Sequence, residues 1–412
     1  MQETSKYAVG IDIGTTNVRC VVGHINPTTG VPTIVGVGIA PNSGMRKGTV
    51  VNLTGPAQAI DDALGEAERM SGYQVDTATI SINGSHIFST HADGMIAVGG
   101  ANHEIDSDDL IRLEDVSTVG KIPANREILE VVPHSYKLDS QDNIKNPLGM
   151  TGTRLEIDAH IVSVLAPHLS NLQKAAEKAN VIPRSIIVAG VAAARAVLSE
   201  KQIENGVVVI DIGGATTNVA IYEEGDLQYT AVIPIGGINI TNDLAIGLKT
   251  DPEIAEQLKI DYASAKFNHD SSGVSIKHNE QIYNFDISDM DEIVEARLEE
   301  LFELVNKELQ RAGRAGKLPN GAILTGGSAK LKGIADYAKE ALGLAVRVGE
   351  ISDYGGVVDD IREPQFATAI GLMLIDAETN NSFGKNTSKH KNKQSILSGT
   401  NKISKFFGRF RI

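Results

Sequence analysis

Cysteine, basic charge and long apolar runs are scarce in this sequence, and each scarcity excludes a class of protein. Cys20 is the single cysteine among 412 residues, which excludes an intramolecular disulfide and a thiolate zinc site. Its apolar neighbours favour a small buried side chain over a reactive thiol. No apolar run approaches the length that spans a bilayer. The N-terminal residues lack the apolar core of a signal peptide, so we expect a cytoplasmic protein.

Basic residues are outnumbered by acidic ones, 38 to 52, which gives a formal net charge of −14. Because a phosphate backbone attracts basic faces, this balance argues against a general nucleic-acid binder. The balance reverses at the C-terminus, where no acidic residue follows Glu378 but eight Lys and Arg do. An acidic body with a basic tail indicates two different kinds of partner.

One internal repeat organises the chain. Residues 8–22 read AVGIDIGTTNVRCVV, and residues 207–222 read VVVIDIGGATTNVAIY. Each copy predicts an apolar strand, a loop that opens with Asp-Ile-Gly, and a second strand. The length predicts at least two domains. Helical patterns alternate with strands around both copies, so we expect two related α/β domains.

Both Asp-Ile-Gly loops have the chemistry that a nucleoside triphosphate needs. Gly14 and Gly213 let the backbone turn tightly and approach phosphate oxygens, and successive backbone N–H groups there form an anion-binding concavity. Hydroxyl donors are added by Thr15, Thr16, Thr216 and Thr217. Asp12 and Asp211 are better placed to hold a hydrated Mg²⁺, which binds few carboxylates. One such loop alone favours a plain β-hairpin turn; two copies, together with a third glycine motif, favour a nucleotide site.

A third glycine motif follows the predicted strand at 323–325. Gly326, Gly327 and Ser328 would let the backbone lie flat against an adenosine ring, although a simple strand-to-helix turn has the same pattern. The sequence contains neither GxxxxGK[ST] nor GxGxxG, so P-loop and dinucleotide sites have no support.

The last thirty-five residues divide into two parts. Residues 378–395 are polar and basic, which predicts a flexible linker. Residues 396–412 regain a helical pattern with an apolar face and a basic face, typical of a helix that lies on an anionic membrane. The alternative is a helix that docks on its own protein. The membrane residues that we expect are Ile396, Lys402, Ile403, Lys405, Phe406, Phe407, Arg409 and Phe410.

These motifs together resemble the FtsA family of bacterial cell-division proteins, within the superfamily of actin, sugar kinases and heat-shock ATPases. The segments 132–155 (VPHSYKLDSQDNIKNPLGMTGTRL), 44–50 (GMRKGTV) and 81–87 (SINGSHI) carry the resemblance most specifically. It implies an α/β, actin-like (ribonuclease-H-like) two-domain fold with a small inserted α+β subdomain and a C-terminal amphipathic helix.

The expected domains follow from this resemblance. The first actin-like domain takes 6–83, 166–203 and 362–377, and the inserted subdomain takes 84–165. The second has its core at 204–250 and 317–361 and an outer subdomain at 251–316.

The resemblance also implies site residues and partners. The first phosphate loop is Asp12, Gly14, Thr15, Thr16 and Asn17. The second is Asp211, Gly213, Gly214, Ala215, Thr216, Thr217 and Asn218. Gly236 and Gly237 fall near the phosphates, and Glu256 and Lys259 on the ribose and adenine contacts, unless these two form a solvated helix face. ATP and Mg²⁺ are the implied cofactors. The implied partners are the C-terminal peptide of the tubulin-like FtsZ, bound near 251–316, further copies of the chain in a filament, other division proteins and the membrane at the division septum.

Slow or negligible ATP hydrolysis is expected. Relatives that turn over carry an acidic residue just before a Pro-x-Ala-Ala-Ala segment, and here residues 189–194 read AGVAAA. Asn218 is neutral where relatives have Asp or Glu, and an amide cannot take the proton of the attacking water. Two other classes stay open: a pilus-assembly adaptor of the same superfamily, and a metabolic sugar kinase or phosphatase. No catalytic Asp over a sugar hydroxyl can be assigned, and the histidines form no HExxH cluster.

Overall fold

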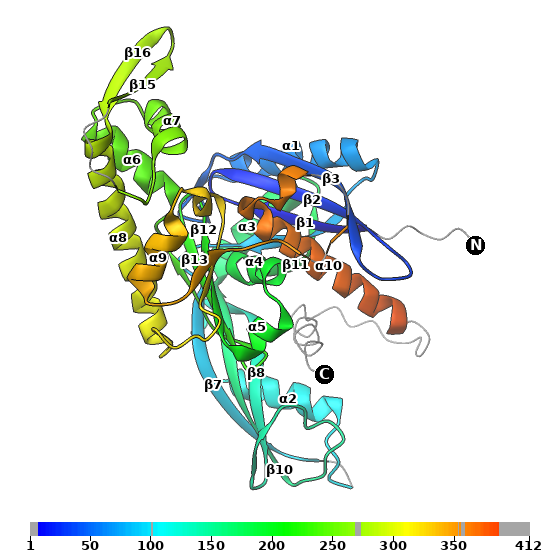
Figure 1. Cartoon of the computed structure of the whole chain (residues 1–412). Helices are drawn as coiled ribbons and strands as arrows, with labels where there is room; N and C mark the ends of the chain where they lie inside the picture. The colour runs from blue at the N-terminus through cyan, green and yellow to red at the C-terminus, as the bar shows by residue number, and fades with distance from the viewer. Residues whose placement is uncertain (1–6, 100–101, 268–272, 353, 356–358, 387–412) are drawn as a thin grey trace.

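The computed structural model describes residues 7–386 except 100–101, 268–272, 353 and 356–358. Strands and helices alternate around two five-stranded sheets, with a four-stranded sheet at one end of the molecule (Figure 1). The α/β architecture expected from the sequence is confirmed.

The first sheet has the strand order β11-β6-β1-β2-β3. Strands β1, β2 and β3 are antiparallel neighbours, and β6 and β11 continue the sheet in parallel. Its strands are β1 (Tyr7–Ile13), β2 (Asn17–Ile25), β3 (Pro32–Pro41), β6 (Thr77–Ile82) and β11 (Ile182–Val188). The helices beside it are α1 (Thr54–Ser71), α3 (Ala166–Lys178), α4 (Ala189–Val197) and α10 (Ala367–Asn386). A short hairpin precedes α1. It consists of two strands of two residues each, β4 (Met45–Arg46) and β5 (Thr49–Val50). Cys20 is fully buried in this core, as predicted.

The second sheet repeats the first, strand for strand, in the order β14-β13-β12-β17-β18. Its first three strands are antiparallel and its last two join in parallel. They are β12 (Val207–Ile212), β13 (Thr217–Glu223), β14 (Asp226–Ile233), β17 (Ala322–Thr325) and β18 (Val346–Val348). The short helices near it are α5 (Glu200–Asn205), α9 (Ile334–Leu342), η1 (Gly327–Lys330), η2 (Asp359–Arg362) and η3 (Pro364–Phe366). The two matching hairpins of the sequence therefore open two sheets of one topology.

A separate four-stranded sheet with one helix is inserted between β6 and α3, and we call it the insert. Its strand order is β7-β10-β8-β9, all antiparallel. Its elements are β7 (Phe88–Ala97), α2 (Ser107–Thr118), β8 (Arg126–Leu138), β9 (Gln141–Ile144) and β10 (Arg154–Leu165). Helix α2 starts where Asp106 accepts hydrogen bonds from the N–H groups of Asp108 and Asp109, a capping arrangement that fixes its first turn. The insert has its own apolar core, so it packs as a unit.

The chain between β14 and β17 forms an outer layer of three helices and a hairpin. These are α6 (Gly237–Gly247), α7 (Pro252–Tyr262), β15 (Gly273–His278), β16 (Gln281–Asp286) and α8 (Ile287–Arg311). An apolar stripe of α8 is buried throughout, at Val294, Leu298, Leu301, Val305 and Leu309. Spacing by three and four residues puts these side chains on one face of the helix.

Helix α10 corrects one expectation, because it runs to Asn386 and the predicted linker starts at 378. Glu378 forms an ion pair with Arg195 of α4 at 2.6 Å, and the Thr379 hydroxyl donates to the Ile375 carbonyl at 2.9 Å. Such contacts keep the chain helical where composition alone predicts a coil. The rest of the predicted linker and the amphipathic segment 396–412 lie outside the described residues. Among the described residues, no helix is long and apolar enough to cross a membrane.

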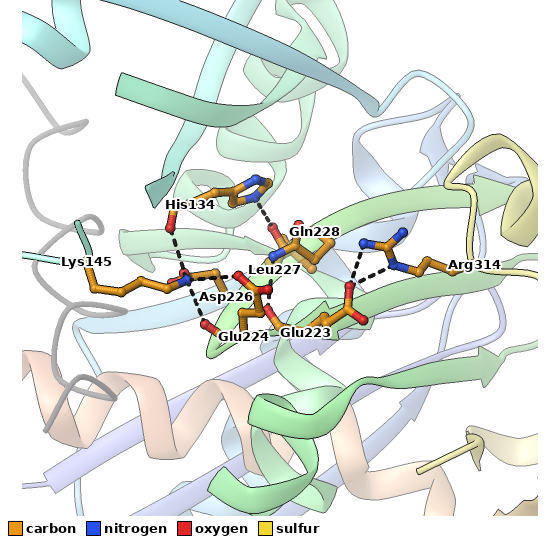
Figure 2. Close-up of polar contacts among 8 residues, drawn as sticks. All are labelled: His134, Lys145, Glu223, Glu224, Asp226, Leu227, Gln228 and Arg314. Atoms are coloured by element: carbon orange, nitrogen blue, oxygen red, sulfur yellow. Dashed lines mark hydrogen bonds and ion pairs between the residues drawn. The ribbon is translucent and has the colours of Figure 1, made fainter. Parts of the chain in front are cut away.

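The insert is bonded to the turn between β13 and β14 of the second sheet (Figure 2). Lys145, just after β9, donates to the backbone carbonyls of His134 and Glu224, both at 3.0 Å, and lies 3.2 Å from Asp226 Oδ2. His134 Nε2 donates to the Leu227 carbonyl at 3.0 Å. Although the chain enters the insert from the first sheet, the insert is therefore also bonded to the second.

Candidate functional site

The two Asp-Ile-Gly loops pack directly on each other. A Cβ atom placed on Gly214 would lie 2.6 Å from Thr16 Cγ2, which shows how closely the second loop approaches the first. The Gly213 N–H closes the second loop by donating to the Thr216 carbonyl at 2.9 Å. Because both loops follow the first strand of their sheets, the repeated topology brings the two predicted phosphate loops together.

Each loop is preceded by a buried or half-buried carboxyl group. The pKa of the Asp211 carboxyl is raised to about 6. Burial is the larger cause, and the negative charge of Asp12 is the second. Burial also raises the pKa of Asp12, although Arg19 and the Ser81 hydroxyl act in the opposite direction. The two carboxyls are therefore near enough to repel each other, and a divalent cation would relieve that repulsion.

Hydroxyl and amide groups hold both carboxyls in place. Ser81, at the end of β6, donates to Asp12 Oδ1 at 2.9 Å and accepts from the Ile13 N–H at 2.8 Å. Asn218 Nδ2 donates to Asp211 Oδ2 at 3.0 Å. Among the described residues no group of three His, Cys, Asp or Glu side chains gathers to hold a metal ion. A donor set of two carboxyls fits Mg²⁺ that keeps most of its water.

Glycines and one serine surround the second loop, as the sequence predicts. The Gly213 carbonyl accepts from the Gly237 N–H at 2.9 Å and from the Ser328 hydroxyl at 3.4 Å. A Cβ on Gly236 would lie 2.5 Å from that same carbonyl. Gly326 has a φ of +86°, and a Cβ there would lie 2.6 Å from Asp211 Oδ1, so only glycine fits. The predicted glycines at 236, 237 and 326 therefore meet around one carbonyl and one carboxyl.

Glu256 and Lys259 lie next to this glycine cluster. Lys259 Nζ donates to the Gly237 carbonyl at 3.2 Å and to the Thr241 hydroxyl at 2.8 Å, and it forms an ion pair with Glu256 at 2.6 Å. The pair thus joins α7 to the first turn of α6. Lys259 is mostly buried, whereas the Glu256 side chain, which also accepts from the Thr241 hydroxyl, is 45% exposed; a role for the pair at the nucleotide stays a prediction.

Two predicted loop residues are already engaged within the protein. The Thr217 hydroxyl is buried and donates to the Ile235 carbonyl at 2.8 Å, so it is not a free donor for phosphate. Asn218 is fully buried, with its amide on Asp211 and Gly190 packed against its Cβ. Ala215 is also buried. Thr217 and Asn218 therefore hold the strand that follows the loop, while the turn itself runs from Gly213 to Thr216 and includes Ala215.

Sequence reasoning missed several residues that hold the loops from distant segments. Asn42, after β3, donates from Nδ2 to the Gly14 carbonyl at 2.7 Å and from its backbone N–H to the Thr16 carbonyl at 2.8 Å. Ser81 and Asn83 were also missed. A signal was available for these two, since polar side chains at the C-terminal end of a parallel strand commonly face a ligand site.

Comparison with known protein families agrees with this geometry. The model of the family described as cell division protein FtsA matches residues 208–371, and the model of the SHS2 domain inserted in FtsA matches residues 84–163. The FtsA protein of Pseudomonas aeruginosa is 36% identical over 376 residues, which cover 90% of this chain and 89% of that protein. FtsA of Bacillus subtilis is 35% identical, covering 89% of this chain and 82% of that protein. For FtsA of Escherichia coli K12 the identity is 31%, with 91% of each chain covered.

Solved structures share the fold at lower identity. A chain of the PilM–PilN type IV pilus biogenesis complex superposes with a TM-score of 0.65 at 16% identity, covering 90% of this chain and 98% of that one. MreB5 of Spiroplasma citri bound to ADP gives 0.56 at 14% identity, covering 92% and 99%. These similarities carry the actin-like fold alone, so the pilus-adaptor alternative gains no support from them. The FtsA relatives, in contrast, are more than 30% identical across nine-tenths of the chain. This chain therefore belongs to the FtsA family of cell-division proteins.

Proposed function

We propose that this chain binds Mg²⁺–ATP between its two hairpin loops and tethers FtsZ filaments to the cytoplasmic face of the membrane at the division septum. The observation that carries the nucleotide part is the contact between the loops, with Asp12 and Asp211 close enough to raise the pKa of Asp211. Family membership supports the division role.

The nucleotide site takes the phosphates on the two loops and the adenosine near Gly326, Gly327 and Ser328. Mg²⁺ supplies positive charge between Asp12, Asp211 and the phosphates. Calorimetric titration of ATP with and without Mg²⁺ tests this proposal. We expect Mg²⁺ to tighten binding in the natural protein and to have little effect on Asp211→Asn. Absence of ATP binding by the natural protein would remove the nucleotide function.

Hydrolysis is expected to be slow, because no carboxylate is available at either predicted water-orienting position. Asn218 is buried with its amide on Asp211, and α4 begins with Ala189 and Gly190. Nucleotide then acts as a conformational clamp rather than as a fuel. A steady-state rate of many turnovers per second would contradict this proposal.

The tail at 396–412 is proposed as the membrane anchor, after a linker that starts beyond Asn386. A few partly buried large side chains contribute about 1–2 kcal/mol each, and each nearby Lys or Arg adds about 1 kcal/mol at an anionic leaflet. One tail is therefore a modest anchor, and a filament of many copies binds strongly through avidity.

Co-sedimentation with anionic liposomes tests the anchor. The full chain is compared with a chain that ends at Asn386, which leaves α10 intact, and with Phe406→Ser/Phe410→Ser. Ile412→Ser is the matched control, since the sequence pattern predicts that Ile412 falls off the apolar face. We expect only the full chain and the control to pellet. If the truncated chain pellets equally well, the anchor lies elsewhere.

The FtsZ peptide is proposed to bind the outer subdomain at 251–316. Ile260 of α7 and Ile282 of β16 are 70% and 67% exposed there, which is unusual for large apolar side chains. Charge reversal in this region should abolish peptide binding in a fluorescence-anisotropy titration. Unchanged binding would place the contact elsewhere.

The domain division expected from the sequence forms part of the proposal, with the first domain extended through α10. Assembly into short filaments is also proposed. Electron microscopy of the full chain on lipid with ATP would reveal such filaments, and their absence at every concentration would contradict assembly.

A further inference from the structure

Two segments that carry the family resemblance meet beside the site. The segment 44–50 contains the β4–β5 hairpin, and the segment 81–87 contains the last two residues of β6 and the turn that follows. Gly48 and Gly84 have φ angles of +78° and +121°, and a Cβ on Gly48 would lie 2.8 Å from the Gly84 nitrogen. Their backbones are thus in direct contact, which a side chain at Gly48 would prevent.

From this contact each segment bonds one loop threonine. The Gly48 N–H donates to Thr15 Oγ1 of the first loop at 3.0 Å. Asn83 Nδ2 donates to Thr216 Oγ1 of the second loop at 2.9 Å. The Asn83 bond therefore runs from the end of β6, in the first sheet, to the turn of the second.

The direction of the Asn83 bond is fixed by its neighbour. The Gly84 N–H donates to Asn83 Oδ1 at 2.7 Å, and a backbone N–H can only donate. The carbonyl end of the amide is therefore identified, and its NH₂ end faces Thr216. A hydroxyl that accepts keeps its own hydrogen for donation. Thr15 and Thr216 are both oriented in this way, in contrast to Thr217, whose hydrogen is given to Ile235.

We propose that Asn83 is a positioning residue for the nucleotide. It holds Thr216 at a fixed distance from the first loop and turns the Thr216 hydroxyl into a donor for a phosphate oxygen. Through its contact with Gly84, Gly48 orients the Thr15 hydroxyl in the same way. The contact between Gly48 and Gly84 therefore sets the spacing of both loops. This inference rests on the proposed binding of Mg²⁺–ATP.

A double-mutant cycle on ATP affinity tests the inference, using Asn83→Ala, Thr216→Val and both together. Loss of one hydrogen bond that orients a group for a charged ligand corresponds to about 10-fold in the dissociation constant. We expect Asn83→Ala to bind Mg²⁺–ATP about 10-fold more weakly. Because Asn83 acts through Thr216, the double variant should bind no more than about 2-fold more weakly than Thr216→Val alone.

A merely structural role would give different results. Thr216→Ser keeps the hydroxyl, so it should bind as the natural protein does and lose affinity again when Asn83→Ala is added. Melting temperatures without nucleotide should stay close to the natural value for every variant. Asn83→Ser replaces Asn83→Ala if the alanine variant folds poorly, since it also cannot reach Thr216.

The matched control is Asn146→Ala in an exposed turn of the insert. Asn146 Oδ1 accepts from the Leu148 N–H at 3.2 Å, the same kind of local bond as at Asn83, but far from the loops in sequence. Its ATP affinity should not change. Additive effects in the cycle, or natural affinity in Asn83→Ala, would overturn the inference while leaving ATP binding intact. A natural protein that fails to bind ATP would instead overturn the proposed function and this inference together.

Discussion

The two hairpins of this chain have one topology and one register but unequal chemistry. Asp12 lies opposite Arg19 in the first hairpin, and Asp211 lies opposite Asn218 in the second. The neighbouring parallel strand supplies a hydroxyl in both cases: Ser81 to Asp12 at 2.9 Å and Thr325 to Asp211 at 3.4 Å. The two hairpins therefore share the scaffold around the carboxyl and differ in its cross-strand partner, a cation in the first and an amide in the second.

This difference separates the electrostatics of the two carboxyls. The charge of Arg19 is the main influence that lowers the pKa of Asp12. On the pKa of Asp211 it has the smallest influence of all. Asp211 depends on an amide and a hydroxyl, and its pKa is raised to about 6. Burial therefore raises the pKa of both carboxyls, and an opposing cation lies across the strand only in the first hairpin. A sequence repeat predicts equal geometry, but the charge beside each carboxyl is decided by positions that differ within the repeat, Arg19 in the first copy and Asn218 in the second.

The largest expected effect comes from filling the space beside Asp211. Gly326→Ala forces a Cβ into contact with Asp211 and the Ile212 carbonyl at a φ of +86°. We expect a loss of about 2–4 kcal/mol in the free energy of unfolding, from strain and overpacking together. Gly327→Ala is the matched control, because a Cβ there meets nothing within 4 Å. Denaturant unfolding of both variants without nucleotide measures the difference. Equal stability would mean that the Asp211 pocket tolerates a side chain.

The next effect concerns the charge on Asp211 itself. A raised carboxyl pKa lowers stability as pH rises from 3.8 to about 6, because the folded state holds a proton that the unfolded state has released. The test compares the free energy of unfolding of Asp211→Asn with that of the natural protein, both without nucleotide. Between pH 4 and pH 7.5 this difference should shift by about 2–3 kcal/mol in favour of the variant.

Unfolding experiments at both pH values measure this gain, with Asp12→Asn as the comparison in the first hairpin. A difference between variant and natural protein that does not change with pH would show that Asp211 titrates normally. The same Asp211→Asn variant should lose the effect of Mg²⁺ on ATP affinity, so that stability and binding change in opposite directions.

The smallest effect distinguishes the outer ends of the two hairpins. The turn after β13 is bonded to Lys145 of the insert (Figure 2). The equivalent turn of the first sheet, residues 26–31, has no charged side chain that could form such an ion pair. Lys145→Met leaves the buried Asp226 without this cation, and we expect a loss of about 1–2 kcal/mol. Lys137→Met, which removes an exposed ion pair with Asp142 inside the insert, should cost less than about 0.5 kcal/mol. Thermal unfolding measures the stability of both variants. Equal losses would mean that the bond from Lys145 to the second sheet stabilises the protein no more than an exposed ion pair does.

The parts of the site that lie within one hairpin could be predicted from the sequence. Asp12, Gly14, Asp211 and Gly213 belong to a local motif whose turn chemistry is set by neighbouring residues. The direction of side-chain bonds could not be predicted, so Thr217 and Asn218 were expected at the phosphates although both bond inward.

Residues that act across the fold were also beyond the sequence. Asn42 and Asn83 reach the loops only because strands distant in sequence lie side by side, and no local pattern records that pairing. The end of α10 was misplaced for the same reason, since Arg195 and Glu378 meet only in the folded chain. The tail residues 396–412 stay a prediction.

The bonds from Lys145 and His134 to the β13–β14 turn have a consequence for how the protein unfolds. The insert has its own core and would otherwise open as an independent cooperative unit. Those bonds join residues 145 and 226, which are separated along the chain by β10 of the insert, by α3, β11 and α4 of the first sheet, and by α5, β12 and β13. Releasing the insert alone therefore means breaking contacts with the second sheet, so amide hydrogens in β8 and β14 should exchange with solvent in the same opening event.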